Sequence, residues 1–226
     1  MRKKIYTWLG REFIALSGEG REGKPATEET VGLFRRIDEE LRGHGLSLAN
    51  TVRTRLWGKD REGRDLGSKE RVKALSGQAR SVSSSYISPV HFDSNAHVAM
   101  DLLAMRTAKP GIEKILKEYD PPITPLRYCI YDSIVFLSGV SAVLPNLSDQ
   151  IADILPRISD SLRDAGTSWG KAVKVSFFLH RSQKIETLRD LFRKTVDTEI
   201  QRIECSFVDG YSAPGKLIEI EVTAQS

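Results

Sequence analysis

Two stretches of the chain carry the hydrophobic periodicity of an amphipathic helix. In the first stretch, apolar residues recur at three- and four-residue spacing, namely Val31, Phe34, Ile37 and Leu41. The second stretch has the same spacing, namely Ile151, Ile154, Leu155, Ile158 and Leu162. This spacing places each set on one face of a helix that packs against a sheet. We predict helices over residues 27–45 and 148–166, because Thr and Ser are favourable N-caps and Gly commonly follows a helix.

Short segments rich in β-branched and aromatic residues surround these helices and predict strands. They are residues 13–17, 51–57, 81–87 and 97–104 in the first half of the chain, and 134–138, 172–179, 203–211 and 217–223 in the second. The last segment contains Ile218-Glu219-Ile220-Glu221-Val222, whose strict alternation predicts a strand with one acidic face and one buried face. A second helix is predicted in each half, over residues 68–75 and 185–196.

The chain contains an internal repeat. Leu16-Ser17-Gly18 recurs as Leu137-Ser138-Gly139, at an offset of 121 residues, and the predicted helices and strands recur in the same order. We therefore predict two homologous domains, 1–106 and 127–226, each an α+β fold whose sheet carries two helices on one face. Residues 107–126 between them are rich in proline and charge, which predicts a linker with one helical turn near residues 112–118.

The composition limits the classes of function. The chain has 226 residues, of which 40% are hydrophobic and 28% charged, as in an ordinary folded protein. A net charge of +4 is too small and too mixed in sign to indicate a nucleic-acid-binding protein. Two cysteines cannot form a disulfide framework, and no apolar segment has the length of a signal peptide or a membrane span. We expect a cytoplasmic protein with no membrane partner.

The sequence motifs indicate neither a cofactor nor a metal. Residues 18–23 match the GxGxxG pattern of dinucleotide-binding proteins, but Lys24 and Pro25 separate these glycines from the predicted helix. The four histidines lack the spacing of a metal site, and the sequence supplies no neighbouring base to activate Cys129 or Cys205. We expect no metal and no cofactor.

The order of the predicted elements, together with Gln78-Ala79-Arg80-Ser81-Val82, resembles the reactive intermediate deaminase family (Rid/YjgF, endoribonuclease L-PSP-like). The five residues are similar to that family's P-A-R-S motif, and the resemblance covers both halves of the chain. It implies chorismate-mutase-like α+β domains, three of which assemble around an axis with small-molecule sites at their interfaces. Active members of the family hydrolyse enamines and imines of amino acids to keto acids and ammonia, without a metal or cofactor.

The resemblance also implies roles for single residues. The family's substrate-carboxylate arginine falls on Arg80, whose planar guanidinium can hold a carboxylate with two hydrogen bonds. The alternative is that Arg80 only caps a strand. The family's water-activating glutamate falls on Glu219, as a general acid or base. In the second half the position that matches Arg80 is Glu204, and in the first half the position that matches Glu219 is Ala99. Each half therefore carries only one of the two groups.

The resemblance further places Ser17 and Ser138 as polar groups that line a site. We therefore expect a small-molecule hydrolase or deaminase for a small anionic substrate, with Arg80 and Glu219 meeting in a composite site. The alternative is a non-catalytic module that binds a small anionic metabolite, and convergence of these two side chains would favour catalysis. A ribonuclease or translation inhibitor ranks last, because the chain lacks a basic stripe with stacking aromatics. Two domains per chain cannot close a ring of three, so we expect a homotrimer.

Overall fold

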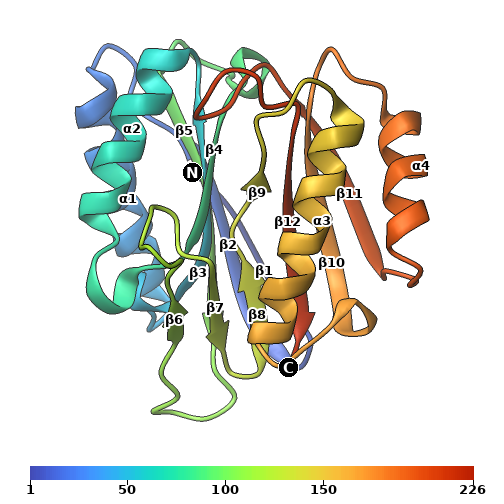
Figure 1. Cartoon of the computed structure of the whole chain (residues 1–226). Helices are drawn as coiled ribbons and strands as arrows, with labels where there is room; N and C mark the ends of the chain where they lie inside the picture. The colour runs from blue at the N-terminus through green and yellow to red at the C-terminus, as the bar shows by residue number, and fades with distance from the viewer.

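The computed structural model describes residues 1–226 as two β-sheets that pack face to face, with a pair of helices on each outer side (Figure 1). The first half contains β1 (Arg2–Trp8), β2 (Arg11–Glu19), α1 (Ala26–Gly43), β3 (Thr51–Gly58), α2 (Arg61–Ala74), β4 (Val82–Ile87) and β5 (Val98–Arg106). The second half contains β6 (Ile115–Lys117), β7 (Tyr128–Tyr131), β8 (Ile134–Leu137), β9 (Val140–Ser141), α3 (Leu147–Asp164), β10 (Ala172–His180), α4 (Ile185–Thr195), β11 (Arg202–Val208) and β12 (Ile218–Gln225). Four 3₁₀ turns lie between them, at Leu48–Asn50, Gly77–Ala79, Pro89–His91 and Trp169–Lys171.

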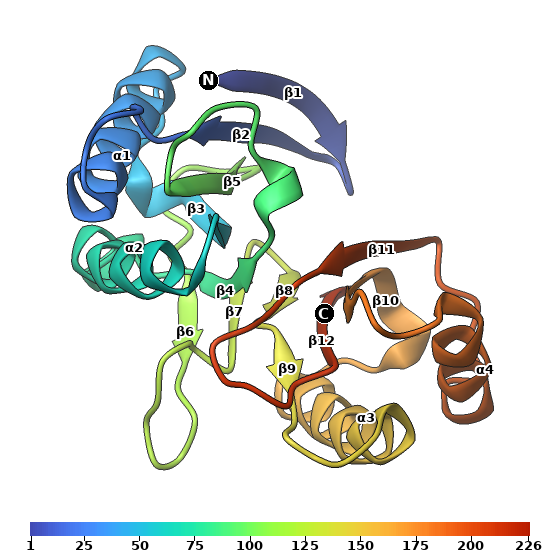
Figure 2. The same ribbon diagram turned by 90° about the horizontal axis from the view of Figure 1, so that it is seen from above.

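The two sheets share one topology. The first has the strand order β1-β2-β5-β3-β4, and the second has β11-β10-β12-β8-β7-β6, with β9 paired to β12. In each sheet a single pair of strands is parallel, β3 with β4 and β10 with β11, and the rest are antiparallel. The predicted α+β class, with two helices on one face of each sheet, is confirmed. Seen from above, the free edges β1 and β11 lie on one side of the molecule (Figure 2).

The helices bury the predicted apolar faces with one exception. In α3 all five predicted residues are buried, and in α1 Phe34, Ile37 and Leu41 are buried. Val31 is exposed, however, and Leu33 takes its place against the sheet. None of the helices is long and apolar enough to cross a membrane.

Three helix starts differ from the prediction. α1 begins after Pro25 and has no side-chain cap, so Thr27 is not its N-cap. α3 is capped by Asn146, which precedes Ser148 by two residues and is an equally good capping residue. α2 begins at Arg61 rather than at residue 68, because Asp60 caps it by accepting a hydrogen bond from a main-chain N–H.

The linker prediction was wrong in one detail. No helical turn forms near residues 112–118. Instead β6 pairs antiparallel with β7 and joins the second sheet. The physical reason is a two-residue alternation, in which Lys114 is buried, Ile115 is exposed and Leu116 is half-buried. Strand β1 was not predicted at all, because its basic residues mask the alternation of an edge strand that pairs with β2.

The last strand also differs from expectation, because both of its faces are buried. Ile218, Ile220 and Val222 face the helices α3 and α4, as predicted. Glu219 and Glu221 point to the other side, where the first sheet covers them and leaves at most 6% of either residue exposed. Two carboxyl groups therefore lie between the sheets, where an ionised group is costly in free energy unless it is paired or hydrogen-bonded.

Candidate functional site

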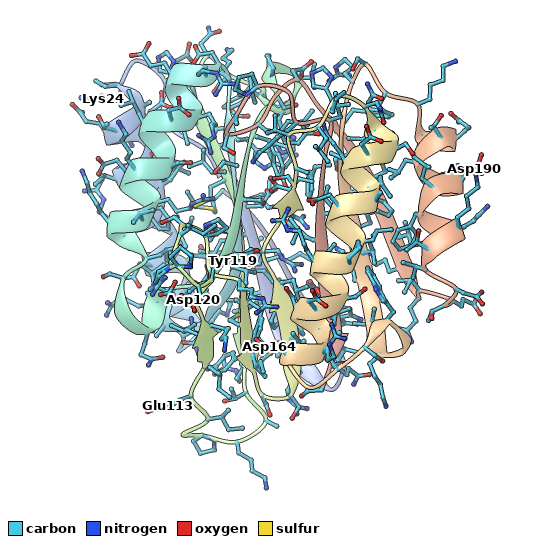
Figure 3. The ribbon with its side chains drawn as sticks, viewed as in Figure 1. Lys24, Glu113, Tyr119, Asp120, Asp164 and Asp190 are labelled. Carbon is cyan, nitrogen blue, oxygen red and sulfur yellow. The ribbon has the colours of Figure 1, made fainter.

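A cavity of about 400 Å³ lies where the two sheets meet, and Glu219 is its only acidic residue. Helix α2 and strand β4 form one wall, and the second half supplies the other through Gly139, Ser141 and Glu219. The segment between β6 and β7 closes the front through Tyr119, which Figure 3 shows between α2 and α3. We call this cavity the Glu219 pocket.

Glu219 is held in place by contacts from both halves of the chain. The hydroxyl of Tyr86, on β4 of the first sheet, donates a hydrogen bond to Oε1 at 3.0 Å. A Cβ atom at position 139 would clash with the Glu219 carboxylate, so the close approach requires Gly139. The glycine of the repeated Leu-Ser-Gly motif is therefore the place where the carboxylate lies against the main chain. In the first half Ala99 replaces the acid, and Gly18 meets no carboxylate.

The surroundings of Glu219 favour its protonated form. Burial raises the pKa of this carboxyl, the cation of Lys216 opposes the rise, and the nearby charge of Glu221 adds to it. Glu219 is thus set to hold a proton at a pH where an exposed glutamate is ionised. A buried carboxylic acid with a raised pKa is a typical general acid.

Arg71 lines the same pocket as Glu219 and forms no ion pair with a carboxylate. It extends from α2, is only 5% exposed, and donates hydrogen bonds to the carbonyl of Ser84 at 2.5 Å and to Oγ of Ser85 at 2.8 Å. Burial lowers its pKa to about 10, and the charge of Arg64 contributes. Glu219 and Glu221 lie near enough to favour the charged form of Arg71, but neither pairs with it directly. An anionic ligand in the pocket would give this buried cation a direct partner.

The position of Arg71 follows from two glycines on the same face of α2. Gly63, Gly67 and Arg71 are spaced four residues apart and are the buried residues of this helix. A Cβ atom at Gly63 would overlap the main chain at His97, so glycine lets the helix lie close to the sheet. That close approach brings the guanidinium onto β4. The Gly-x₃-Gly-x₃-Arg spacing is the sequence signal that could have identified Arg71.

Three further cations line the same pocket, Arg64, Arg157 and Lys216. The two arginines form ion pairs with Asp65 and Asp153, which lie outside the pocket, and Lys216 donates to Oγ of Ser212. Four cations therefore line one cavity together with a single carboxyl group, whose pKa is raised. Such a cavity attracts small anions.

A buried network beneath the pocket joins the two sheets. Glu221 of β12 accepts hydrogen bonds from Arg55 at 2.7 Å and from the Ser84 hydroxyl at 2.6 Å, and it lies 3.3 Å from Nε of Arg53. Burial alone would raise the pKa of Glu221, but the charges of Arg55 and Arg53 outweigh it and lower the pKa to about 2. Since the carbonyl of Ser84 accepts from Arg71, this network also fixes the position of the Arg71 guanidinium.

Arg80 lies beside the Glu219 pocket rather than in it. Its Nη1 donates to Oε1 of Glu118 at 2.5 Å, and its side chain lines an adjoining cavity of about 290 Å³. The two cavities share Arg71 and the residues Val72, Ser83, Thr124 and Pro125. Arg80 and Glu219, which come from different halves, thus approach the same junction but line neighbouring cavities. The guanidinium that converges with Glu219 is that of Arg71, which the sequence reasoning missed.

The two predicted serines have different positions. Ser138 is buried, and its Oγ accepts a hydrogen bond from the main-chain N–H of Ser83 at 3.3 Å, which links the two sheets. Ser17 lines two other cavities, together with Arg2 and Asp101, and neither contains Glu219. The structure places no group of three or more His, Cys, Asp or Glu side chains where they could hold a metal ion.

No family model matches the chain, and no curated protein is similar to it in sequence. Among solved structures, a chorismatase covers 98% of this chain and 79% of its own length, with a TM-score of 0.65 and 14% identity. A member of the YjgF/YER057c/UK114 family from Mycobacterium tuberculosis covers 50% of this chain and 100% of its own, with a TM-score of 0.43 and 20% identity. A Rid family protein from Yersinia pestis matches 50% of this chain and 99% of its own, with a TM-score of 0.46 and 21% identity.

These similarities concern the fold. The two Rid/YjgF structures are each similar to about half of this chain, as the sequence resemblance predicts. The chorismatase has a comparable fold over nearly the whole chain, including both sheets. The fold is thus a two-part α+β architecture similar to that of the chorismatase, with a cationic cavity at the junction of its halves.

Proposed function

We propose that the protein is a small-molecule hydrolase of the Rid type that acts on a small carboxylate in the Glu219 pocket. The observation that carries the proposal is that Arg71 and Glu219 line one cavity, one as an unpaired buried cation and the other as a buried acid. The cation suits a substrate carboxylate, and the acid suits proton transfer to the reacting bond. In this proposal Arg71 has the anchoring role that the sequence assigned to Arg80.

The proposed reaction begins with a substrate whose carboxylate is bound by Arg71. Next to this carboxylate the substrate has a C=C bond that carries an amino nitrogen or an ether oxygen. Protonated Glu219 donates its proton to the terminal carbon and leaves an iminium or oxocarbenium centre, whose charge the new Glu219 carboxylate stabilises. Water then adds to this centre, and the same carboxylate takes up the proton that the water loses. Collapse of the adduct releases ammonia or an alcohol and leaves a keto acid.

Two substrate types fit this scheme. Rid-type enamines of amino acids carry nitrogen on the double bond, and the enolpyruvyl ether of chorismate carries oxygen. The similarity in fold to a chorismatase over the whole chain supports including the second type. The four cations of the pocket suit either one.

The test is release of pyruvate, which both substrate types yield. The full chain would be mixed with chorismate, or with the enamine formed continuously by dehydration of serine, and pyruvate would be measured with lactate dehydrogenase. We expect release well above the uncatalysed rate for one of them, with ammonia formed only from the enamine. Uncatalysed rates with both substrates would contradict the proposal.

Substitution of Arg71 tests the anchor. Arg71→Met should weaken carboxylate binding about tenfold to a hundredfold, because it removes charge-assisted hydrogen bonds of about 1.5–3 kcal/mol. Arg71→Lys should restore only part of the affinity, since an ammonium cannot present the planar fork. Titration calorimetry with the substrate identified above measures the effect, and Lys73→Met, on the exposed face of the same helix, is the control. Equal affinities for Arg71→Met and the control would exclude Arg71 as the anchor.

The second candidate is a non-catalytic module that binds a small anionic metabolite in the same pocket. The four cations support it as well as they support catalysis. The raised pKa of Glu219 favours the hydrolase, because a binding site for anions gains nothing from a buried acid. Tight binding without turnover would favour the module.

We also propose that the chain forms the homotrimer expected from its sequence. Two of the four edge strands, β1 and β11, have no neighbour on their outer sides, and they expose Ile5, Ile203 and Phe207. Unpaired edges with exposed apolar residues commonly pair with another chain. Light scattering at micromolar concentration should give three times the mass of one chain, and the mass of a monomer would contradict the proposal.

A further inference from the structure

A second open cavity lies beside β1, at the opposite edge of the first sheet from β4. It has a volume of about 320 Å³, and residues of β1, β2, β3 and β5 line it together with Lys174 of β10. A neighbouring cavity of about 380 Å³ shares Arg2, Ser17 and Asp101 with it. We call the two cavities together the Asp101 groove. It has no lining residue in common with the Glu219 pocket, and it lies on the side of the molecule that carries β1 (Figure 2).

The strand register places four of the lining residues in one row across the first sheet. Arg2 lies opposite Ser17, Ser17 lies opposite Asp101, and Asp101 lies opposite Arg55. Residues directly opposite each other on adjacent strands have their side chains on the same face of the sheet. Asp101 therefore lies beside Arg55 on the face that borders the groove.

Asp101 forms no ion pair, although a cation lies opposite it in the sheet. Its Oδ2 accepts a hydrogen bond from Nε1 of Trp57 at 2.8 Å, and its Oδ1 has no hydrogen-bond partner. Arg55 instead reaches to the second sheet, where its Nε and Nη2 bind the carboxylate of Glu221. Glu221 is the residue that matches Asp101 in the internal repeat, and it pairs with two guanidinium groups. The half-buried carboxylate of Asp101 is thus left without a cation.

The groove also contains cationic nitrogens that no carboxylate occupies. Nη1 of Arg55 makes no hydrogen bond. Lys4 forms no ion pair, and its Nζ lies 5.7 Å from the centre of the Tyr6 ring. Ala15 and Leu103 lie in the same row as Lys4 and line the groove. These residues give the groove free cationic donors around an apolar floor.

The two cavities of the groove differ in charge. The first has one acidic residue, Asp101, and six basic ones, namely Arg2, Lys3, Lys4, Arg53, Arg55 and Lys174. The second has three acidic residues, namely Glu19, Asp93 and Asp101, beside Arg2 and His91. Asp101 lies where the two cavities meet. A ligand with one positive and one negative group suits both cavities, whereas a simple anion is repelled by the carboxylate of Asp101.

We propose that the Asp101 groove binds an α-amino acid with an apolar side chain, at a site separate from the Glu219 pocket. The ammonium group of the ligand binds Oδ1 of Asp101, and its carboxylate binds Nη1 of Arg55 and the ammonium of Lys4. Both charged groups of an α-amino acid are attached to one carbon, which suits two directly opposite side chains whose Cβ atoms lie about 4.5–5.5 Å apart. The apolar side chain packs against Ala15 and Leu103. This inference does not depend on the proposed function.

The probes are L-leucine and L-phenylalanine, each compared with the two analogues that lack one of its charges. For leucine the analogues are 4-methylpentanoate and 3-methylbutylamine, and for phenylalanine they are 3-phenylpropanoate and 2-phenylethylamine. Titration calorimetry on the full chain at pH 7 should show, for the better side chain, that the amino acid binds about tenfold tighter than either analogue. The reason is that each analogue loses one charge-assisted contact.

Asp101→Asn tests the contact with the ammonium group. The amide oxygen can still accept the hydrogen bond from Trp57, but the negative charge is gone. Binding of the amino acid should weaken about tenfold, to the level of the carboxylate analogue, while binding of that analogue stays unchanged or becomes stronger. A purely structural role of Asp101 would weaken binding of all three probes. Asp190→Asn is the matched control, since Asp190 is exposed on α4 (Figure 3).

Lys4→Met tests the contact with the carboxylate. It should weaken binding of the amino acid and of the carboxylate analogue about threefold to tenfold, and it should not weaken binding of the amine. The matched control is Lys24→Met, which removes another exposed lysine (Figure 3).

The outcomes separate this site from the Glu219 pocket. Equal affinities for the amino acid and its analogues would overturn the site, and so would the absence of binding by both amino acids. Binding that is lost in Arg71→Met and kept in Asp101→Asn would place the amino acid in the Glu219 pocket and would also overturn it. The expected pattern in a protein that hydrolyses nothing would support the Asp101 groove and contradict only the hydrolase.

Discussion

Replacement of Glu219 by glutamine is expected to lower turnover about 100- to 10,000-fold, the usual contribution of a positioned general acid or base. The amide keeps the shape of the side chain and can still accept the hydrogen bond from Tyr86, but it can neither donate a proton to carbon nor take one from water. Carboxylate affinity should change by less than about threefold, because the anchoring cations are untouched. Initial rates and calorimetry on the same preparation measure both quantities.

The same substitution should not destabilise the fold. Because the pKa of Glu219 is raised in the folded state, its contribution to stability is present at acidic pH and is lost as the pH rises through the folded pKa. The glutamine variant lacks this loss, so its stability relative to the unmodified chain should increase with pH. Retained turnover, or a lost affinity that accompanies unfolding, would contradict the role of Glu219.

The pH dependence of catalysis gives an independent check on the acid. If protonated Glu219 begins the reaction, kcat/KM should fall as the pH rises through its raised pKa. Glu219→Gln should remove this part of the profile. A rate that instead increases over this pH range would assign Glu219 the role of a base from the outset.

The repeated architecture was predictable because its signals are local. The apolar faces of the helices and the alternation of residues 218–222 are patterns within a short segment, where the periodicity determines which face is buried. The Leu-Ser-Gly motif is itself only three residues long and can be recognised in each half separately. The start of α2 was not predictable in this way. Gly63 and Gly67 have poor helix propensity, and they are tolerated because contact with the sheet requires small residues there.

The site was predictable only in part, because some of its residues are defined by tertiary contacts and not by a local pattern. Glu219 could be found because it lies on a regular strand and matches a motif of a known family. Arg71 forms its contacts with β4, which follows it after a turn, and its partners are a main-chain carbonyl and a serine that carry no signature. The Arg80–Glu118 pair depends on how the linker folds back, and its composition does not determine that.

Replacement of Glu221 by glutamine should have the largest effect on stability of any single change in the site. It leaves the buried Arg53 and the half-buried Arg55 without their carboxylate partner, and breaking a buried ion pair in this way costs about 3–5 kcal/mol. Chemical denaturation at pH 7 should show this loss. The control is Glu204→Gln on the edge strand β11, whose ion pair with Lys174 is more exposed and should contribute less than about 1 kcal/mol.

The pH dependence distinguishes this ion pair from a simple packing effect. The pKa of Glu221 is about 2 in the folded state, below its ordinary value of 4.5, so its stabilisation is complete above pH 4.5 and is lost as the pH falls toward 2. The difference in unfolding free energy between the unmodified chain and Glu221→Gln should shrink over that range. Glu219, two residues away, should show the opposite dependence, because the first sheet gives Glu221 two guanidinium partners and gives Glu219 only a phenol. A difference independent of pH would mean that the glutamine variant loses packing rather than charge pairing.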